Sequence, residues 1–153
     1  MSDGKRLKPV GGIVSVAVVP AGTAAVGSAE AAAAAAVGVP LVEGCSSYDE
    51  KTDSHDGIIR IEHRLTIAVP PEYAREHIDE RTLRLWAAVG TAAVVTTEAG
   101  ERLLAGWSER FGGEQPLRLV GMESSTGKTP HSTPAVVLTF RSIDTSPALR
   151  IGD

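Results

Sequence analysis

Cysteine and aromatic residues are scarce in this chain of 153 residues. Cys45 is the only cysteine, so an intramolecular disulfide, a thiolate zinc cluster and a paired redox motif are all excluded. Aromatic residues make up 4% of the chain, so the core must be built from small and branched side chains. Such a thin core favours stabilisation by neighbouring subunits.

Long apolar runs and a basic excess are also missing. No segment reaches the length of a membrane span, so we expect no membrane insertion. The formal net charge is -4, which disfavours general binding to nucleic acid through phosphate contacts. The spacing of reactive side chains matches no catalytic, cofactor or metal motif. We therefore expect neither an enzyme nor a cofactor-dependent protein.

The length suits one domain spanning residues 1–153. Residues 1–10 are a candidate N-terminal arm, and residues 146–153 are a candidate C-terminal tail. The start of the chain has the outline of a secretory signal, but Gly11, Gly12 and Pro20 interrupt its apolar run. We instead predict a strand over Ile13–Val19, with apolar residues on both faces and hence burial on both.

Residues 21–57 combine a low-complexity alanine-rich segment with a polar stretch. Ser28 as N-cap and Gly38 as terminator predict a short helix over about residues 29–37. The polar residues 43–57 predict an exposed loop.

Strong alternation then predicts a strand over Ile58–Val69, with Ile59, Ile61 and Leu65 among the residues of its core face. Pro70 and Pro71 end this strand. A helix follows with Asp79 as N-cap and Gly90 as terminator. We expect its buried face to comprise Leu83, Trp86 and Ala87.

Two strand pairs complete the expected fold. Residues 91–97 and 102–107 flank a turn in which Gly100 supplies a positive φ. Residues 117–121 and 136–141 form the last pair around a loop over 123–134, with Val136, Leu138 and Phe140 on one face. The sequence thus predicts an α+β, mainly β fold of about six mostly antiparallel strands, arranged as a sandwich or barrel, with one or two short helices.

Three apparent chemical motifs fail on inspection. Residues 121–129 resemble a phosphate-binding P-loop but are one residue too long and are followed by prolines. Asp49, Asp53 and Asp56 lack the alternate spacing and closing glutamate of a calcium loop. His63 lies on the apolar face of its strand, where a hydrogen-bonded structural histidine is expected.

A basic stripe is the best candidate site. Arginines on the solvent side of the strands usually form a solvated face, here with Glu62 interleaved. The sharper hypothesis is a subunit interface, because arginine combines bidentate pairing with an apolar stem. Trp107, at the end of a hairpin strand, joins this set. The candidate interface residues are Arg60, Arg64, Arg118, Arg141 and Trp107.

One resemblance is carried by Ile67–Pro70, the turn Glu98–Gly106 and the later Gln115–Leu119. This succession resembles small structural proteins of tailed bacteriophages and prophages, of the head-to-tail connector and tail kind. It covers about residues 57–149 and leaves the N-terminal third outside. The resemblance implies a virion subunit, made in the cytoplasm of a bacterial host, that forms a neck or tail ring and contacts other virion proteins without catalysing a reaction.

Two other classes stay open from the residues alone. One is an enzyme or ligand-binding domain with a site beside the 43–57 segment, using His55, His63 or Asp56. The other is a monomeric cellular adaptor that binds one partner.

Overall fold

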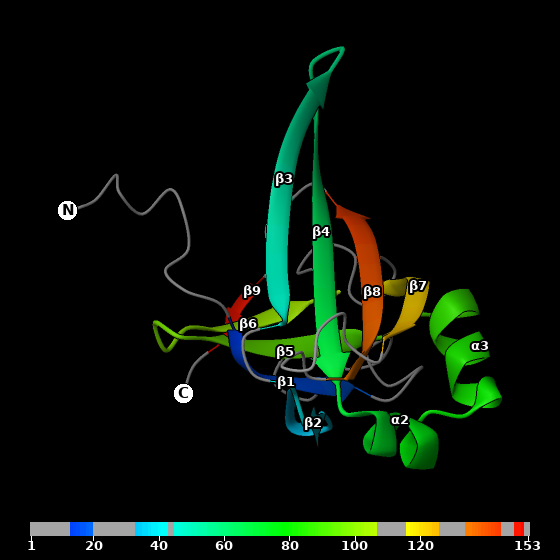
Figure 1. Cartoon of the computed structure of the whole chain (residues 1–153). Helices are drawn as coiled ribbons and strands as arrows, with labels where there is room; N and C mark the ends of the chain where they lie inside the picture. Colours follow the sequence, from blue (N-terminus) through cyan, green and yellow to red (C-terminus); the bar gives the residue numbers. More distant parts are fainter. Residues whose placement is uncertain are drawn as a thin grey trace.

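In the described residues, two antiparallel sheets carry two helices at one end (Figure 1). A computed structural model of the chain describes residues 13–19, 33–42, 45–106, 116–125, 134–144 and 149–151. Within these ranges, one sheet has the strand order β2-β1-β5-β6-β9 and the other the order β3-β4-β8-β7. The elements are β1 (Ile13–Val19), β2 (Val37–Val39), β3 (Ser47–His55), β4 (Ile58–Val69), α2 (Pro71–His77), α3 (Glu80–Ala88), β5 (Ala92–Thr97), β6 (Arg102–Ala105), β7 (Arg118–Ser125), β8 (Ala135–Asp144) and β9 (Leu149–Ile151). The predicted α+β, mainly β sandwich is confirmed.

The main core lies between the two sheets. Alternate residues of β1, β5 and β6 meet alternate residues of β4 and β8, because successive side chains of a strand point to opposite faces. The predicted inward face of Val136, Leu138 and Phe140 is confirmed, since all three are buried. Trp86 of α3 closes the end of this core, with its ring edge-on to Phe140 at 5.4 Å between centroids.

A second apolar cluster covers the opposite side of the five-stranded sheet. Val19, Val94 and Leu104 are buried there beneath Ala33 and other residues of the alanine-rich segment. The prediction that β1 is buried on both faces therefore holds for its second half. It is wrong for Val14, which is 56% exposed beside a register shift between Ile13 and Ser15.

The alanine-rich segment ends differently from the prediction. Residues 29–32 of the expected helix lie outside the described ranges, and Ala33 and Ala34 are helical. Val37 belongs to β2, where it pairs with Val18 of β1. The predicted end of the helix at Val37 is therefore wrong, because the β-branched Val37 and Val39 complete the edge of a sheet.

The predicted loop over residues 43–57 is also wrong. Ser47–His55 forms β3, which pairs with β4 along its whole length. Asp56 and Gly57 both have positive φ, 53° and 78°, as a tight two-residue hairpin turn requires. Polar residues form a strand here because β4 supplies the hydrogen-bonding partner, so no apolar face is needed.

The β3–β4 hairpin projects well beyond the rest of the molecule (Figure 1). Ile58 and Ile59 near its tip are 61% and 53% exposed. The bounds predicted for the Ile58–Val69 strand are confirmed, but the assignment of Ile59 to the core is wrong. It is exposed because its part of the strand extends past the opposing sheet.

The helix α3 begins and ends as predicted. The Asp79 side chain accepts a hydrogen bond from the Thr82 N–H at 2.8 Å, and Gly90 has a φ of 88°. Ala87 is exposed, so its predicted burial is wrong: the turn of the helix directs it away from the sheets. The helix α2 was not predicted, although Pro71 at its first position is a favourable start.

The remaining strands extend the predicted pattern. The β5–β6 hairpin and the β7–β8 pair are confirmed, and β7 runs on to Ser125 into the predicted loop. Leu149–Ile151 forms β9 on the edge of β6, so this part of the C-terminal tail belongs to the chain's own sheet. The candidate arm over residues 1–10 lies outside the described ranges.

Candidate functional site: a charged sheet face

The exposed face of the four-stranded sheet carries most of the candidate interface residues. Odd-numbered residues of β3, even-numbered residues of the first part of β4 and odd-numbered residues of β8 point away from the core, because the strand period is two. Shallow depressions of about 140 and 270 Å³ lie on it. We call this surface the charged face; its ionisable residues that carry a charge at pH 7 are Asp49, Lys51, Asp53, Arg60, Glu62, Arg64, Arg118, Glu123 and Arg141.

Three of the predicted arginines form one row. Arg64 on β4 is the register partner of Arg141 on β8, which is the partner of Arg118 on β7. Neighbouring strands lie about 4.8 Å apart, so three positive charges are held close together across the sheet. The sequence predicted the residues, and the strand register brings them together.

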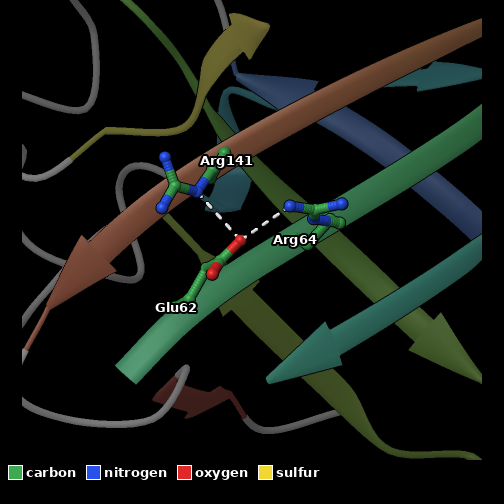
Figure 2. A network of polar contacts seen from close by, with 3 residues as sticks. All are labelled: Glu62, Arg64 and Arg141. Carbon is green, nitrogen blue, oxygen red and sulfur yellow. Dashed lines mark hydrogen bonds and ion pairs between the residues drawn. The ribbon is translucent and has the colours of Figure 1, made fainter. Parts of the chain in front are cut away.

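Glu62 joins two of these arginines (Figure 2). Its Oε2 accepts a hydrogen bond from Arg141 Nε at 2.8 Å and another from Arg64 Nη2 at 2.9 Å. The Arg141 contact, followed by the Arg64 contact, holds the pKa of the Glu62 carboxyl below its usual range. The carboxylate therefore fixes the direction of both guanidinium groups.

The other arginines have no such partner. Among the described residues, neither Arg60 nor Arg118 makes an ion pair within 4 Å. Arg60 is the register partner of Asp53. This pair lies closer to the hairpin tip than the pair of Lys51 and Glu62. Trp107, the fifth predicted residue, lies outside the described ranges.

The charge of this face differs in sign from that of the chain. Its five cationic and four anionic side chains give a net +1, on a chain whose net charge is -4. The remaining residues therefore carry a net -5. Opposite charges on two parts of one molecule are the condition for head-to-tail attraction between copies.

A polar cluster lies on the inner side of the same sheet. His63 is 3% exposed, and its Nδ1 lies 2.7 Å from the Tyr48 hydroxyl oxygen and 3.4 Å from Glu50 Oε2. The Tyr48 hydroxyl donates to Glu50 Oε2 at 2.7 Å. Burial, and then the charge of Glu50, raises the pKa of Tyr48, so its hydroxyl stays protonated. The prediction that His63 lies on an inward face and is hydrogen-bonded is confirmed.

The residues proposed for a site beside the 43–57 segment do not converge. His55 and Asp56 lie at the hairpin tip, where they form an exposed pair 3.4 Å apart. His63 pairs with Glu50, five residues back along β3, which corresponds to about 17 Å along a strand. The described part of the chain contains no group of three His, Cys, Asp or Glu side chains arranged to hold a metal ion.

An apolar groove of about 510 Å³ separates α2 from the ends of β7 and β8. Ala74, Ile78, Leu83 and Met122 contribute to its walls, and Arg75 is its charged residue. No sequence pattern predicted this groove, because it depends on the unpredicted α2. In the described ranges, no helix has the length and apolarity needed to cross a membrane.

Comparison of the chain with known protein families, characterised proteins and solved structures gives no significant match.

Proposed function

We propose that this protein is a structural subunit of a tailed bacteriophage or prophage. It acts in the neck or tail by ring-type self-association and by contacts with other virion proteins, and it catalyses no reaction. Its place is the virion, and the cytoplasm of the bacterial host during assembly. The observation that carries the proposal is the arginine row on an exposed sheet face of a chain that is otherwise acidic.

Charge separation favours head-to-tail contact. Each subunit of a ring presents two different surfaces to its neighbours. The charged face, with a net +1, is one such surface, and the acidic remainder of the chain supplies the other. Arg118 is the best placed residue for this contact, because no ion pair to a described residue engages its guanidinium and β7 lies at the edge of the sheet.

The rival classes receive less support from the geometry. The enzyme or ligand-binding hypothesis assumed a loop over residues 43–57. Ser47–His55 is instead a strand, and its residues from Asp49 onward are exposed. The cluster around His63 has internal partners, with Tyr48 and Glu50 both in contact. In a monomeric adaptor, the arginine row would not contact the acidic surface that a second copy of the chain provides.

The test is the mass of the purified full chain by light scattering, combined with negative-stain imaging. We expect discrete rings that weaken as salt rises, because exposed charges are screened. Arg118→Glu reverses a charge that has no ion-pair partner among the described residues, so it should abolish the rings without unfolding the chain. Arg81→Glu makes the same charge change on the exposed side of α3 and should leave them intact.

Gene order tests the virion assignment separately. Adjacent genes for capsid, portal or tail proteins would support it, and adjacent genes of cellular metabolism would contradict it.

Rings that survive Arg118→Glu would disprove the role of the arginine row. A wild-type chain that stays monomeric, both alone and with the products of neighbouring genes, would rule out the ring.

A further inference from the structure

Among the described strands, β3 lies at the edge of its sheet and leaves its outer edge free. In the described part of the chain its only neighbour is β4. In a two-residue hairpin the residues flanking the turn form a hydrogen-bonded pair, here His55 and Ile58. Odd-numbered residues of β3 therefore bond to β4, and the N–H and C=O groups of Tyr48, Glu50, Thr52 and Ser54 point to the free edge.

When two copies of β3 run antiparallel, unlike charges of the two copies can lie opposite each other. Reading outward from Thr52, Lys51 on one side corresponds to Asp53 on the other, and Asp49 corresponds to His55. We propose that two copies of the chain pair along β3 about a two-fold axis at Thr52, which joins their four-stranded sheets into one eight-stranded sheet. The partner is thus a second copy of this chain.

This register satisfies the backbone. Thr52 lies opposite Thr52 of the second copy, and Glu50 lies opposite Ser54 of the second copy. Thr52 directs its backbone groups to this outer edge, so the central Thr52–Thr52 pair can exchange N–H···O=C bonds. The two-fold axis stands perpendicular to the sheet, so the charged faces of both copies lie on the same side.

The side chains then alternate in sign across the joined edges. One row runs from Glu62 through Lys51 to Asp53 and Arg60 of the second copy. Symmetry repeats this row on the other side of the axis. Directly opposed charges of unlike sign stabilise antiparallel pairs by roughly 0.2–1 kcal/mol each.

Neighbouring registers bring like charges together. A shift that centres the axis on Lys51 opposes Lys51 to its own copy and Asp49 to Asp53. A shift that centres it on Asp53 opposes Asp53 to its own copy and Glu50 to Asp56. Charged side chains on strand edges usually prevent pairing. Here they exclude the adjacent registers and permit the one centred on Thr52.

This contact is separate from the proposed ring. A two-fold contact closes at a dimer, whereas a ring needs a head-to-tail contact. Pairing through β3 would join two chains, or two rings, and it does not use Arg118. The dimer and the ring can therefore fail independently.

Position-specific disulfides test the register. The variants are made in a Cys45→Ser background. Thr52→Cys places one cysteine of each copy opposite the other, with their Cα atoms about 5.5 Å apart, which is within disulfide range. Ser54→Cys lies on the same face of β3 but about 14 Å from its copy along the strand. We expect mild oxidation to give a covalent dimer for Thr52→Cys and little or none for Ser54→Cys. Equal yields, or a dimer only at Ser54→Cys, would overturn the proposal.

A proline variant tests the backbone contact. Thr52→Pro removes an N–H that points to the free edge and is not needed for pairing with β4. We expect its dimer dissociation constant, measured by sedimentation, to rise at least about tenfold, which corresponds to about 1.4 kcal/mol. Thr52→Val has a similar shape, keeps the N–H and should dimerise like the wild type.

Circular dichroism of both variants shows whether the hairpin is retained. A folded Thr52→Pro that still dimerises would overturn the proposal, and so would a wild-type chain that shows no two-fold dimer at about millimolar concentration. If Thr52→Pro fails to fold, the disulfide pair decides the question.

Discussion

At the scale of single residues, Glu62 has the most consequential contacts on the charged face. It accepts hydrogen bonds from Arg64 and Arg141, which would otherwise repel each other across β4 and β8. Both arginines are about half exposed, so solvent screening limits what the pair contributes to stability.

We predict that Glu62→Gln lowers the free energy of unfolding at pH 7 by about 1 kcal/mol or less. Its pKa is lowered in the folded state, so its contribution is present above the ordinary glutamate pKa of about 4.3. The contribution is lost as the pH falls through the lower folded pKa. Urea unfolding at pH 7 and pH 3 measures this, and the difference between variant and wild type should shrink at pH 3.

Glu123→Gln is the matched control, because Glu123 lies exposed on β7 and has no ion pair with a described residue. It should change stability little at either pH. An effect as large as that of Glu62→Gln would show that the two arginine contacts are not the cause.

The Tyr48 hydroxyl is the second residue of interest, because it lies between His63 and Glu50. Tyr48→Phe leaves part of a buried polar cluster without its partner, so we expect a loss of about 1–2 kcal/mol in urea unfolding. Tyr73→Phe removes a hydroxyl that makes no described hydrogen bond and should cost less. Equal losses would contradict the role of the cluster.

At the scale of elements, two turns each require a glycine with positive φ, but the atoms around the two glycines differ. Gly90 and Gly100 have φ of 88° and 90°. A Cβ on Gly90 would lie 2.7 Å from Pro116 Cβ and 2.9 Å from the Leu117 oxygen, whereas one on Gly100 would meet nothing within 4 Å. The turn after α3 is therefore crowded as well as left-handed.

We predict that Gly100→Ala costs about 1–2 kcal/mol, the price of a left-handed conformation. Gly90→Ala should cost about 2 kcal/mol more, because Pro116 and Leu117 must also move. Thermal unfolding of both variants measures the difference. Similar losses would mean that the segment at Pro116 shifts freely.

The projecting hairpin is the second element that the structure makes testable. Deleting Ser54, His55, Ile58 and Ile59 removes two residue pairs while keeping the Asp56–Gly57 turn and the strand alternation. These residues are exposed, so we expect the unfolding midpoint in urea to change little. A large loss of stability would show that the tip contacts the body of the molecule.

At the scale of the whole molecule, the two proposed contacts lie at opposite ends of one sheet. Arg118 is on β7 and Thr52 is on β3, with β8 and β4 between them. We predict additive behaviour, since distant sites without shared partners rarely couple. Arg118→Glu should leave two-fold dimers, Thr52→Pro should leave single rings, and the double variant should be monomeric by light scattering. A single variant that abolishes both assemblies would show that the contacts are coupled.

The strand and helix signals that depend on local chemistry were available in the sequence. Alternation defined Ile58–Val69, the Asp79 cap and Gly90 defined α3, and Gly100 marked the β5–β6 turn. These features arise from side-chain period and backbone conformation within a few residues. The Asp56–Gly57 pair was also a hairpin signal, but the polar residues before it predicted a loop.

The apolar strands, the cap of α3 and the identity of the arginines can be inferred from the order of the residues alone. The strand formed by the polar residues 47–55 follows from the folded arrangement, because β4 supplies their hydrogen-bonding partner. The common row of Arg64, Arg141 and Arg118 has the same origin, because register is set by pairing between segments distant in sequence. Exposure of Ile59 and Val14 depends in the same way on where the opposing sheet ends, and no local pattern records that boundary.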